Sequence, residues 1–136
     1  MAVVKELIRN EENGAISFGD YTLDAKTKLE DFAAGGNLYK VKTFKELTKL
    51  EKDGMFVYES EPGTSVTNYK ETNDGVSFTV CGNDDAMITV GLLEDTTYNV
   101  TVAGKSVGAI KTNLSGKLSV SVELADMGEV AVQIEK

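Results

Sequence analysis

The stretch VAGKSVGAIKTNLSGKLSVSVEL, residues 102–124, decides between a nucleotide-binding loop and a β-sheet. Its Gly104-Lys105-Ser106 segment matches the end of a phosphate-binding P-loop, but that loop needs a glycine five residues before the Gly-Lys pair, and Asn99 occupies the position. Apolar and polar residues alternate over the last third of the stretch, which places successive side chains on opposite faces of a strand. We therefore predict a hairpin whose turn is the Gly-Lys-Ser segment, between strands at residues 98–102 and 107–111.

The same alternation runs through the whole C-terminal half of the chain. Turn-forming residues separate the alternating segments, because they tolerate positive φ or bond their own backbone; Asn73-Asp74-Gly75 and Ser115-Gly116 are two examples. Five or more short strands at this spacing are typical of a β-sandwich or barrel. We predict a C-terminal antiparallel β-sandwich, with further strands at residues 76–80, 87–90, 118–122 and 130–134.

The N-terminal half is less regular, and its simplest interpretation is a short β-meander. Strands are predicted at residues 3–8, 15–18 and 21–23, and the last two are joined across Gly19-Asp20. The fold class that we predict for the whole chain is therefore all-β.

Residues 44–52 support two interpretations. Thr43 with Glu46 forms a capping-box pattern, and the apolar residues that follow recur at helical spacing, which favours one short helix. Against the helix, Asp53-Gly54 precedes the strongly β-prone residues 55–58, and Asp-Gly between such segments is the strongest short-range hairpin signal. We favour strands here, with the helix as the alternative.

Length and composition suit one domain or two small β-rich halves. The chain has 136 residues, of which 41% are hydrophobic, enough to bury a core. Glu61-Pro62-Gly63 holds the single proline and is typical of a joint. We divide the chain there into an N-terminal β-rich subdomain, residues 1–60, and a C-terminal sandwich subdomain, residues 64–136.

Charge and cysteine content restrict the partners and the compartment. The formal net charge of −8 opposes binding to nucleic acid or to anionic membranes, because both depend on clustered Lys and Arg. Cys81 is the single cysteine, so no intramolecular disulfide can form. No apolar run reaches the roughly 20 residues that span a bilayer, and the first ten residues lack a signal-peptide pattern. We expect a cytoplasmic protein, with a surface or particle location as the alternative.

The residue inventory excludes most catalytic machinery. The chain has no histidine, which removes the commonest general base and every Ser-His-Asp or Cys-His arrangement. Cys81 continues the apolar face of a predicted strand and is interpreted as a buried structural thiol. We expect no cofactor and no zinc or iron–sulfur site. Asn83, Asp84 and Asp85 are the candidate calcium ligands in one turn, although calcium takes six to eight oxygens.

Aromatic residues are the candidates for contacts with a glycan or a protein partner. Glycan-binding sites use aromatic platforms, and the chain has no Trp and only 7% aromatic residues. Tyr58 also fits a core position in a strand. A catalytic carboxylate pair cannot be singled out among 22 Asp and Glu residues. The candidates are therefore Tyr39, Phe56, Tyr58 and Tyr69.

Two stretches resemble known β-sandwich families. LLEDTTYNVTV, residues 92–102, resembles the Leu-x-Pro-x-Thr-x-Tyr-x-Val-x-Val signature of fibronectin type III domains, with Glu94 at the proline position. The resemblance implies that Tyr98 forms a tyrosine corner, in which its hydroxyl bonds the backbone a few residues upstream. The following AGKSVGAIKTNLSGKLSVSVEL resembles the terminal β-sandwich modules attached to glycosidases and polysaccharide lyases.

Over almost its whole length the chain also resembles a group of short bacterial proteins that carry the name endosialidase. The segments that carry the resemblance are GDYTLDAKTKLEDF, LYKVKTFKELTKLEKDGMFVYESEPGT and GAIKTNLSGKLSVSVEL. The resemblance implies a bacterial origin and a glycoside hydrolase of endosialidase type. Sialidases hold the sialic-acid carboxylate with several arginines, whereas this chain has Arg9 alone.

The expected function is that of a non-catalytic β-rich interaction or assembly module, as part of a larger surface or phage-like structure. Such a module binds itself or another protein. We expect a homo-oligomer, because Met55, Phe56 and Val57 are three consecutive large apolar residues in one strand. The alternative is a glycan-related protein, either a carbohydrate-binding accessory module or an endosialidase-like hydrolase.

Overall fold

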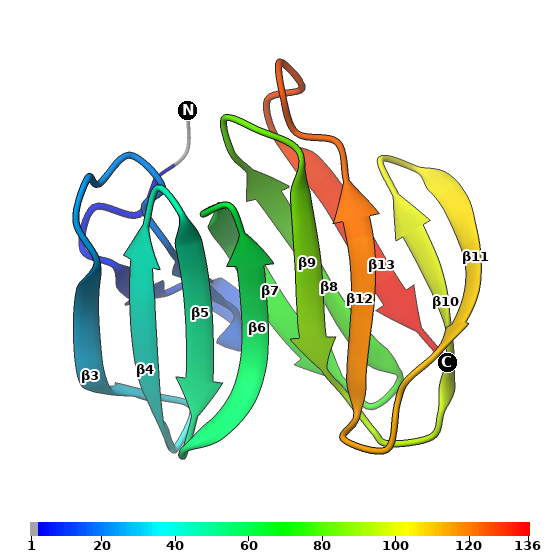
Figure 1. Cartoon of the computed structure of the whole chain (residues 1–136). Coiled ribbons are helices and arrows are strands. Elements are labelled where there is room, and N and C mark those ends of the chain that lie inside the picture. Colours follow the sequence, from blue (N-terminus) through cyan, green and yellow to red (C-terminus); the bar gives the residue numbers. More distant parts are fainter. Residues whose placement is uncertain (1–2) are drawn as a thin grey trace.

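The computed structural model describes residues 3–136, which form two antiparallel β-sheets that lie face to face (Figure 1). The all-β sandwich predicted from the sequence is confirmed. The one helical element in these residues is the short 3-10 turn η1 (Glu12–Gly14). One sheet has seven strands, in the order β1 (Ile8–Asn10), β2 (Ile16–Phe18), β7 (Ser65–Thr72), β8 (Gly75–Cys81), β13 (Val130–Glu135), β10 (Thr97–Val102) and β11 (Lys105–Lys111). The other has six, in the order β12 (Lys117–Val122), β9 (Ala86–Gly91), β6 (Met55–Glu61), β5 (Leu47–Lys52), β4 (Asn37–Phe44) and β3 (Thr27–Ala34).

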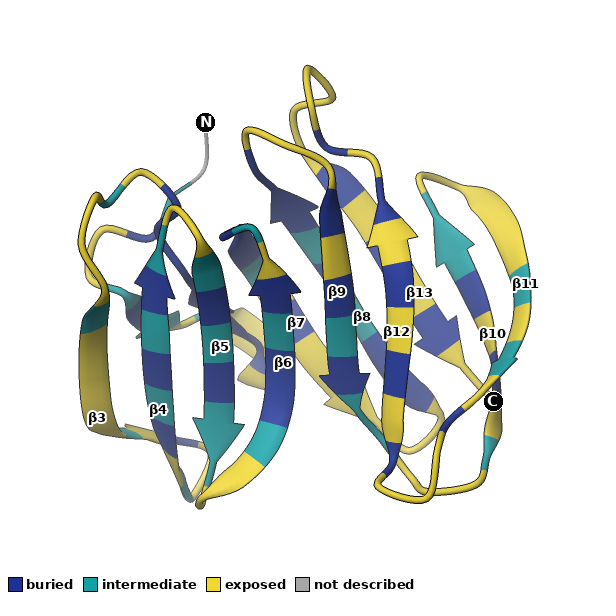
Figure 2. Cartoon of the chain, viewed as in Figure 1, coloured by how far each residue is buried: buried dark blue, intermediate teal, exposed yellow. Residues whose placement is uncertain are grey.

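Alternate residues on the strands fill the space between the sheets with one hydrophobic core. On β12, Leu118, Val120 and Val122 are buried while the residues between them are exposed, and Figure 2 shows this banding. The β2–β7 and β6–β9 pairings join strands from before and after Pro62. The segments predicted as two subdomains therefore share both sheets and contribute to one core.

The N-terminal strands differ from the prediction in position. β3 to β6 form a meander of consecutive antiparallel strands. The strand predicted at residues 3–8 is wrong, because Leu7 has a φ of 76° and β1 begins only at Ile8. The strand predicted at residues 21–23 is a turn, in which the Asp20 carboxylate accepts the backbone N–H of Thr22 at 2.9 Å.

Residues 44–52 contain no helix, so the helical alternative is wrong. β4 ends at Phe44 and β5 begins at Leu47, and the Asp53-Gly54 turn joins β5 to β6 as predicted. Thr43 caps no helix, since its hydroxyl hydrogen-bonds the Thr48 hydroxyl at 2.9 Å inside the core. Burial of the alternate strand residues outweighs the weak local preference for helix.

A chain of buried hydroxyl groups crosses the core beside the proline joint. The Thr48 hydroxyl donates to the Thr64 carbonyl at 2.7 Å. The Thr64 hydroxyl in turn hydrogen-bonds the hydroxyls of Tyr58 and Ser60, each at 2.8 Å. These contacts fix the path of the chain as it passes from β6 in one sheet to β7 in the other.

The β10–β11 hairpin is formed as predicted. The turn, however, is Ala103-Gly104, and β11 begins at Lys105, two residues before the predicted strand, so Lys105 and Ser106 belong to the sheet. The Tyr98 hydroxyl accepts the backbone N–H of Leu93 at 3.3 Å, five residues upstream. This is the contact implied by the resemblance to fibronectin type III domains, and it anchors the loop between β9 and β10.

Candidate interaction surfaces

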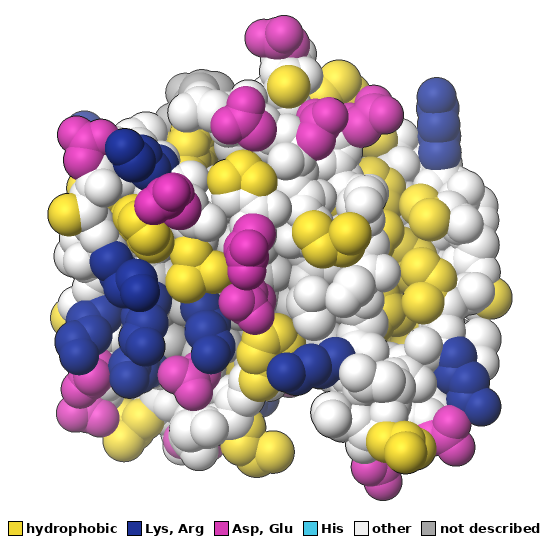
Figure 3. Space-filling view, viewed as in Figure 1, with side chains coloured by type: hydrophobic (Ala, Val, Ile, Leu, Met, Phe, Trp, Pro, Cys, Tyr) yellow, Lys and Arg dark blue, Asp and Glu magenta, His cyan; other side chains and the backbone are white. Residues whose placement is uncertain are grey.

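An apolar groove lies at the end of the sandwich where the β5–β6 turn, the β7–β8 turn and the β9–β10 loop meet. It encloses about 450 Å³. Met55 and Leu93 line it with exposed fractions of 72% and 57%, and the half-buried Phe56 lines it as well. Lys52 and Glu71, which form an ion pair, add a polar side. Figure 3 shows hydrophobic side chains beside a notch at the lower edge of this face.

The groove owes its apolar wall to the local structure of β6. A bulge in the β5–β6 pairing turns Val57 into the core, where it is 5% exposed, and leaves Met55 and Phe56 outside. The Lys117 ammonium lies 4.6 Å from the centre of the Phe56 ring, within cation–π range. A Cβ at Gly91 would lie 2.6 Å from the Phe56 carbonyl oxygen, so the glycine permits this close approach. Of the three consecutive apolar residues 55–57, one therefore belongs to the core and two to the surface.

A second, polar pocket of about 210 Å³ opens between the two sheets. Tyr39 from β4 and Tyr69 from β7 both line it, with exposed fractions of only 9% and 3%. Lys52 Nζ lies 3.1 Å from Glu71 Oε2 beside them. Neither tyrosine hydroxyl has a hydrogen-bond partner among the residues that the structure describes. Burial raises the pKa of both tyrosines, so both hydroxyls stay protonated and can donate at neutral pH.

Two other residues singled out in the sequence belong to the core. Tyr58 is fully buried and its hydroxyl is bonded to Thr64, so it is not accessible to a glycan or a partner. Cys81 is buried, as predicted for a structural thiol. Burial, together with the neighbouring Cys81, raises the pKa of Tyr21 to about 12.

The predicted calcium ligands lie in the exposed turn between β8 and β9. Asn83 and Asp84 face solvent, whereas the Asp85 carboxylate accepts the backbone N–H groups of Leu124 at 2.9 Å and Ala125 at 3.2 Å. Asp85 therefore ties this turn to the loop between β12 and β13. Within residues 3–136, no group of three or more Cys, Asp or Glu side chains is placed to hold a metal ion.

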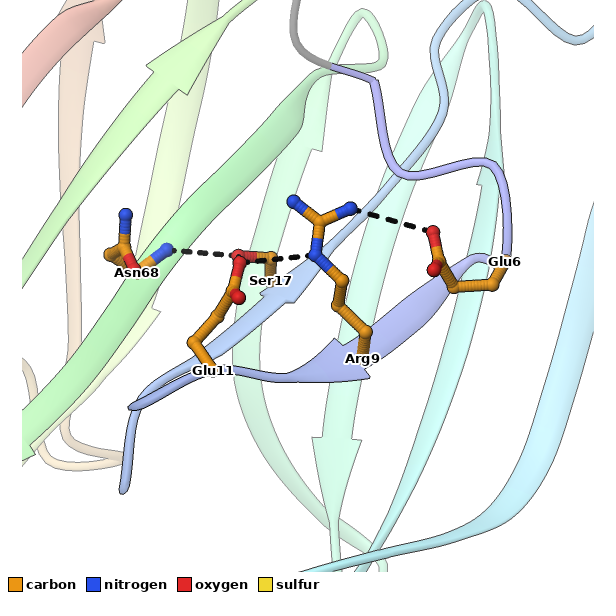
Figure 4. A network of polar contacts seen from close by, with 5 residues as sticks. All are labelled: Glu6, Arg9, Glu11, Ser17 and Asn68. Atoms are coloured by element: carbon orange, nitrogen blue, oxygen red, sulfur yellow. Dashed lines mark hydrogen bonds and ion pairs between the residues drawn. The ribbon is translucent and has the colours of Figure 1, made fainter. Parts of the chain in front are cut away.

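The single arginine is held in a network of polar contacts (Figure 4). Arg9 Nε donates to the Glu11 carboxylate at 3.1 Å, and the guanidinium also lies 3.5 Å from Glu6. The Ser17 hydroxyl donates to the same Glu11 carboxylate and accepts the backbone N–H of Asn68 at 3.1 Å. The network fastens β1 and β2 to the bulge of β7, so the arginine charge is engaged by carboxylates of its own chain.

Lysines gather on the outer face of the six-stranded sheet, although the net charge is −8. Lys28, Lys42 and Lys49, here called the lysine row, are direct cross-strand partners on β3, β4 and β5. Lys40 lies beside them on the same face of β4. Figure 3 shows this patch of basic side chains over the three strands. In the sequence, only the alternation of Lys40 and Lys42 hints at this patch. The row itself arises from the pairing of three strands, which the sequence does not display.

The fold places the chain in the broad class of antiparallel β-sandwich proteins. No protein-family model matches the chain, and no curated protein or solved structure is significantly similar to it. Within the described residues, no helix is long and apolar enough to cross a membrane. Function is therefore inferred from the groove, the pocket and the charged faces.

Proposed function

We propose that the protein is a non-catalytic assembly module that binds a second copy of itself, or another protein, through the apolar groove. The observation that supports it most directly is the exposure of Met55 and Leu93 around one groove with Phe56 at its wall. Burial of one such side chain contributes about 1.5–3 kcal/mol. An apolar centre with a polar rim, here Lys52 and Glu71, is typical of protein contacts.

The non-catalytic part of the proposal rests on the available chemistry. The chain has no histidine, and its single arginine already contacts Glu6 and Glu11. A site that grips an anionic sugar needs a free guanidinium, since the planar fork pairs with a carboxylate through two hydrogen bonds. Purified protein should therefore release no sugar from sialosides.

Sedimentation velocity of single-residue variants tests the groove contact. Wild-type protein should sediment as a larger species than a folded Met55→Glu variant, because a carboxylate buried in an apolar contact carries a large desolvation cost. Met87→Glu is the matched control, since Met87 is also exposed but lies on the outer face of β9. Equal sedimentation of all three proteins would contradict the proposed contact.

The Phe56→Glu variant separates a contact residue from a core residue. Because the Phe56 ring is half-buried and faces the Lys117 ammonium, a glutamate there can reach that charge at the surface. We expect Phe56→Glu to stay folded and to associate more weakly than wild type, because the groove contact is lost. Unfolding of this variant, seen by circular dichroism, would assign Phe56 to the core.

The polar pocket supports a second candidate function, that of a glycan-binding module. Tyr39 and Tyr69 offer two unpaired hydroxyls, and Lys52 and Glu71 offer a donor and an acceptor. The volume of about 210 Å³ is below that of sites for drug-sized ligands and suits a single sugar ring. A glycan-array screen tests it: binding that is lost in a folded Tyr69→Phe variant would favour this candidate over the assembly module.

A further inference from the structure

We propose that the lysine row binds the acidic loops of a second copy of this chain, so that copies join head to tail. The inference rests on the proposed assembly function, but it uses a different face of the molecule from the groove. The acidic loops, here called the acidic tip, are the β8–β9 turn and the β12–β13 loop, and their carboxylates are Asp84, Glu123, Asp126 and Glu129.

The lysine row is electrostatically unbalanced within one chain. Like charges directly opposite each other on neighbouring strands are destabilising, and Lys42 stands between Lys28 and Lys49. Glu30 contacts Lys28 at 3.6 Å and Lys40 at 3.5 Å. Lys42 and Lys49, in contrast, form no ion pair with any residue from 3 to 136. Their charges are available to carboxylates from outside the chain.

Carboxylates border the lysine row on two sides without neutralising its centre. Glu59 on β6 is the cross-strand partner of Lys49, and Glu51 on β5 is the partner of Lys40, but neither pair lies within ion-pair distance. Thr89 on β9 is the cross-strand partner of Glu59, and Ser119 on β12 is the partner of Thr89. Hydroxyl side chains therefore follow Glu59 across the sheet. The row is therefore a basic strip at one end of a flat polar face.

The acidic tip is a single, fixed surface, although it comes from two loops. The Asp85 carboxylate accepts the backbone N–H groups of Leu124 and Ala125, which holds the β8–β9 turn against the β12–β13 loop. Figure 3 shows acidic side chains along the upper edge of the molecule, where these loops lie. None of the four tip carboxylates forms an ion pair within the described chain.

The two surfaces are complementary in charge but lie on different parts of the molecule. The row covers strands β3 to β5, whereas the tip is at the loops beyond β8, β9, β12 and β13 (Figure 1). One chain cannot bring them together, so the row of one copy must meet the tip of another. A contact of this heterologous kind leaves a free row and a free tip, and it builds an open chain or a closed ring.

A charge-swap experiment tests the contact at one salt concentration, about 0.1 M NaCl. The row variant carries Lys42→Glu with Lys49→Glu, and the tip variant carries Asp84→Lys, Glu123→Lys and Glu129→Lys, which leaves Asp126 as its one carboxylate. Each variant alone should associate at least about tenfold more weakly than wild type, because both of its surfaces then have the same sign. In an equimolar mixture the acidic row meets the basic tip and the basic row meets the acidic tip, so association should return.

The control is Lys70→Glu with Lys105→Glu, which changes the net charge as the row variant does but at exposed lysines elsewhere. Lys42→Gln with Lys49→Gln replaces the row variant if that variant is unfolded. A row variant that associates like the control, or a mixture that does not recover, overturns the head-to-tail contact. Weaker association in Met55→Glu but not in the row variant leaves the groove contact standing. A monomeric wild type ends the head-to-tail contact and the self-association part of the proposed function.

Discussion

At the scale of single residues, the core depends on hydroxyl groups as well as on apolar side chains. The Thr64 hydroxyl lies between the hydroxyls of Tyr58 and Ser60, 2.8 Å from each, in a region without solvent contact. A buried polar group left without a partner costs about 1–3 kcal/mol. The Thr64 hydroxyl therefore satisfies two other buried hydroxyl groups at once.

Removal of the Thr64 hydroxyl should lower the free energy of unfolding more than removal of the hydroxyl of one of its partners. Thr64→Val leaves both Tyr58 and Ser60 without this contact, so we expect a loss of about 2–4 kcal/mol in the free energy of unfolding. Tyr58→Phe leaves the Thr64–Ser60 contact in place, and the loss should be about 1 kcal/mol. Urea denaturation measures both, with the exposed Thr97→Val as control. A larger loss in Tyr58→Phe than in Thr64→Val would contradict the network.

Glu11 makes stability depend on pH at the N-terminal strands. The hydrogen bond from Ser17, with the nearby Arg9, lowers the pKa of the Glu11 carboxyl below its ordinary value of 4.5. A lowered pKa means that the ionised carboxylate stabilises the fold above pH 4.5, and that this stabilisation is lost as pH falls through the folded-state pKa. Wild type should be more stable than Glu11→Gln at about pH 6, and the difference should shrink towards about pH 3. A difference that is constant across this range would exclude the effect.

At the scale of elements, the strands that the sequence predicted are those with unbroken alternation. β8, β9, β10, β12 and β13 each lie where the period-two pattern places them. β3 and β7 were missed because each contains a bulge, between Leu29 and Phe32 and between Thr67 and Lys70. A bulge moves the following side chains to the other face, which breaks the pattern in the sequence.

The candidate surfaces were harder to predict from the sequence than the strands were. Tyr39 and Phe56 were named as contact residues, and both line a pocket or groove, but Tyr58 is in the core. Which of these residues share a surface depends on the pairing of strands far apart in the chain. The lysine row has the same origin, because it exists only in the register that joins β3, β4 and β5.

The lysine row should reduce the stability of the sheet that carries it. Lys42 has a lysine directly opposite on each side, and like-charge pairs of this kind are destabilising. We expect Lys42→Thr to raise the free energy of unfolding by about 0.2–1 kcal/mol. Lys105→Thr on the edge strand β11 is the control and should have a smaller effect. Urea denaturation in which Lys42→Thr is the less stable of the two would mean that the row does not repel itself.

At the scale of the whole molecule, the sandwich carries three surfaces that its own chain does not complete. The groove exposes Met55 and Leu93, while Lys42 and Lys49 of the lysine row and the carboxylates of the acidic tip form no ion pair in the described chain. The groove contact is apolar and the row–tip contact is electrostatic, so the two can act independently. Together they would build a structure larger than a dimer.

Sedimentation equilibrium of the wild-type protein tests the assembly function most directly. The measurement gives the molar mass over about a hundredfold range of concentration, and association makes that mass depend on concentration. We predict a mass that rises above the 14.6 kDa of one chain as concentration increases, and that stays lower in Met55→Glu. A mass of 14.6 kDa at every concentration would contradict the account.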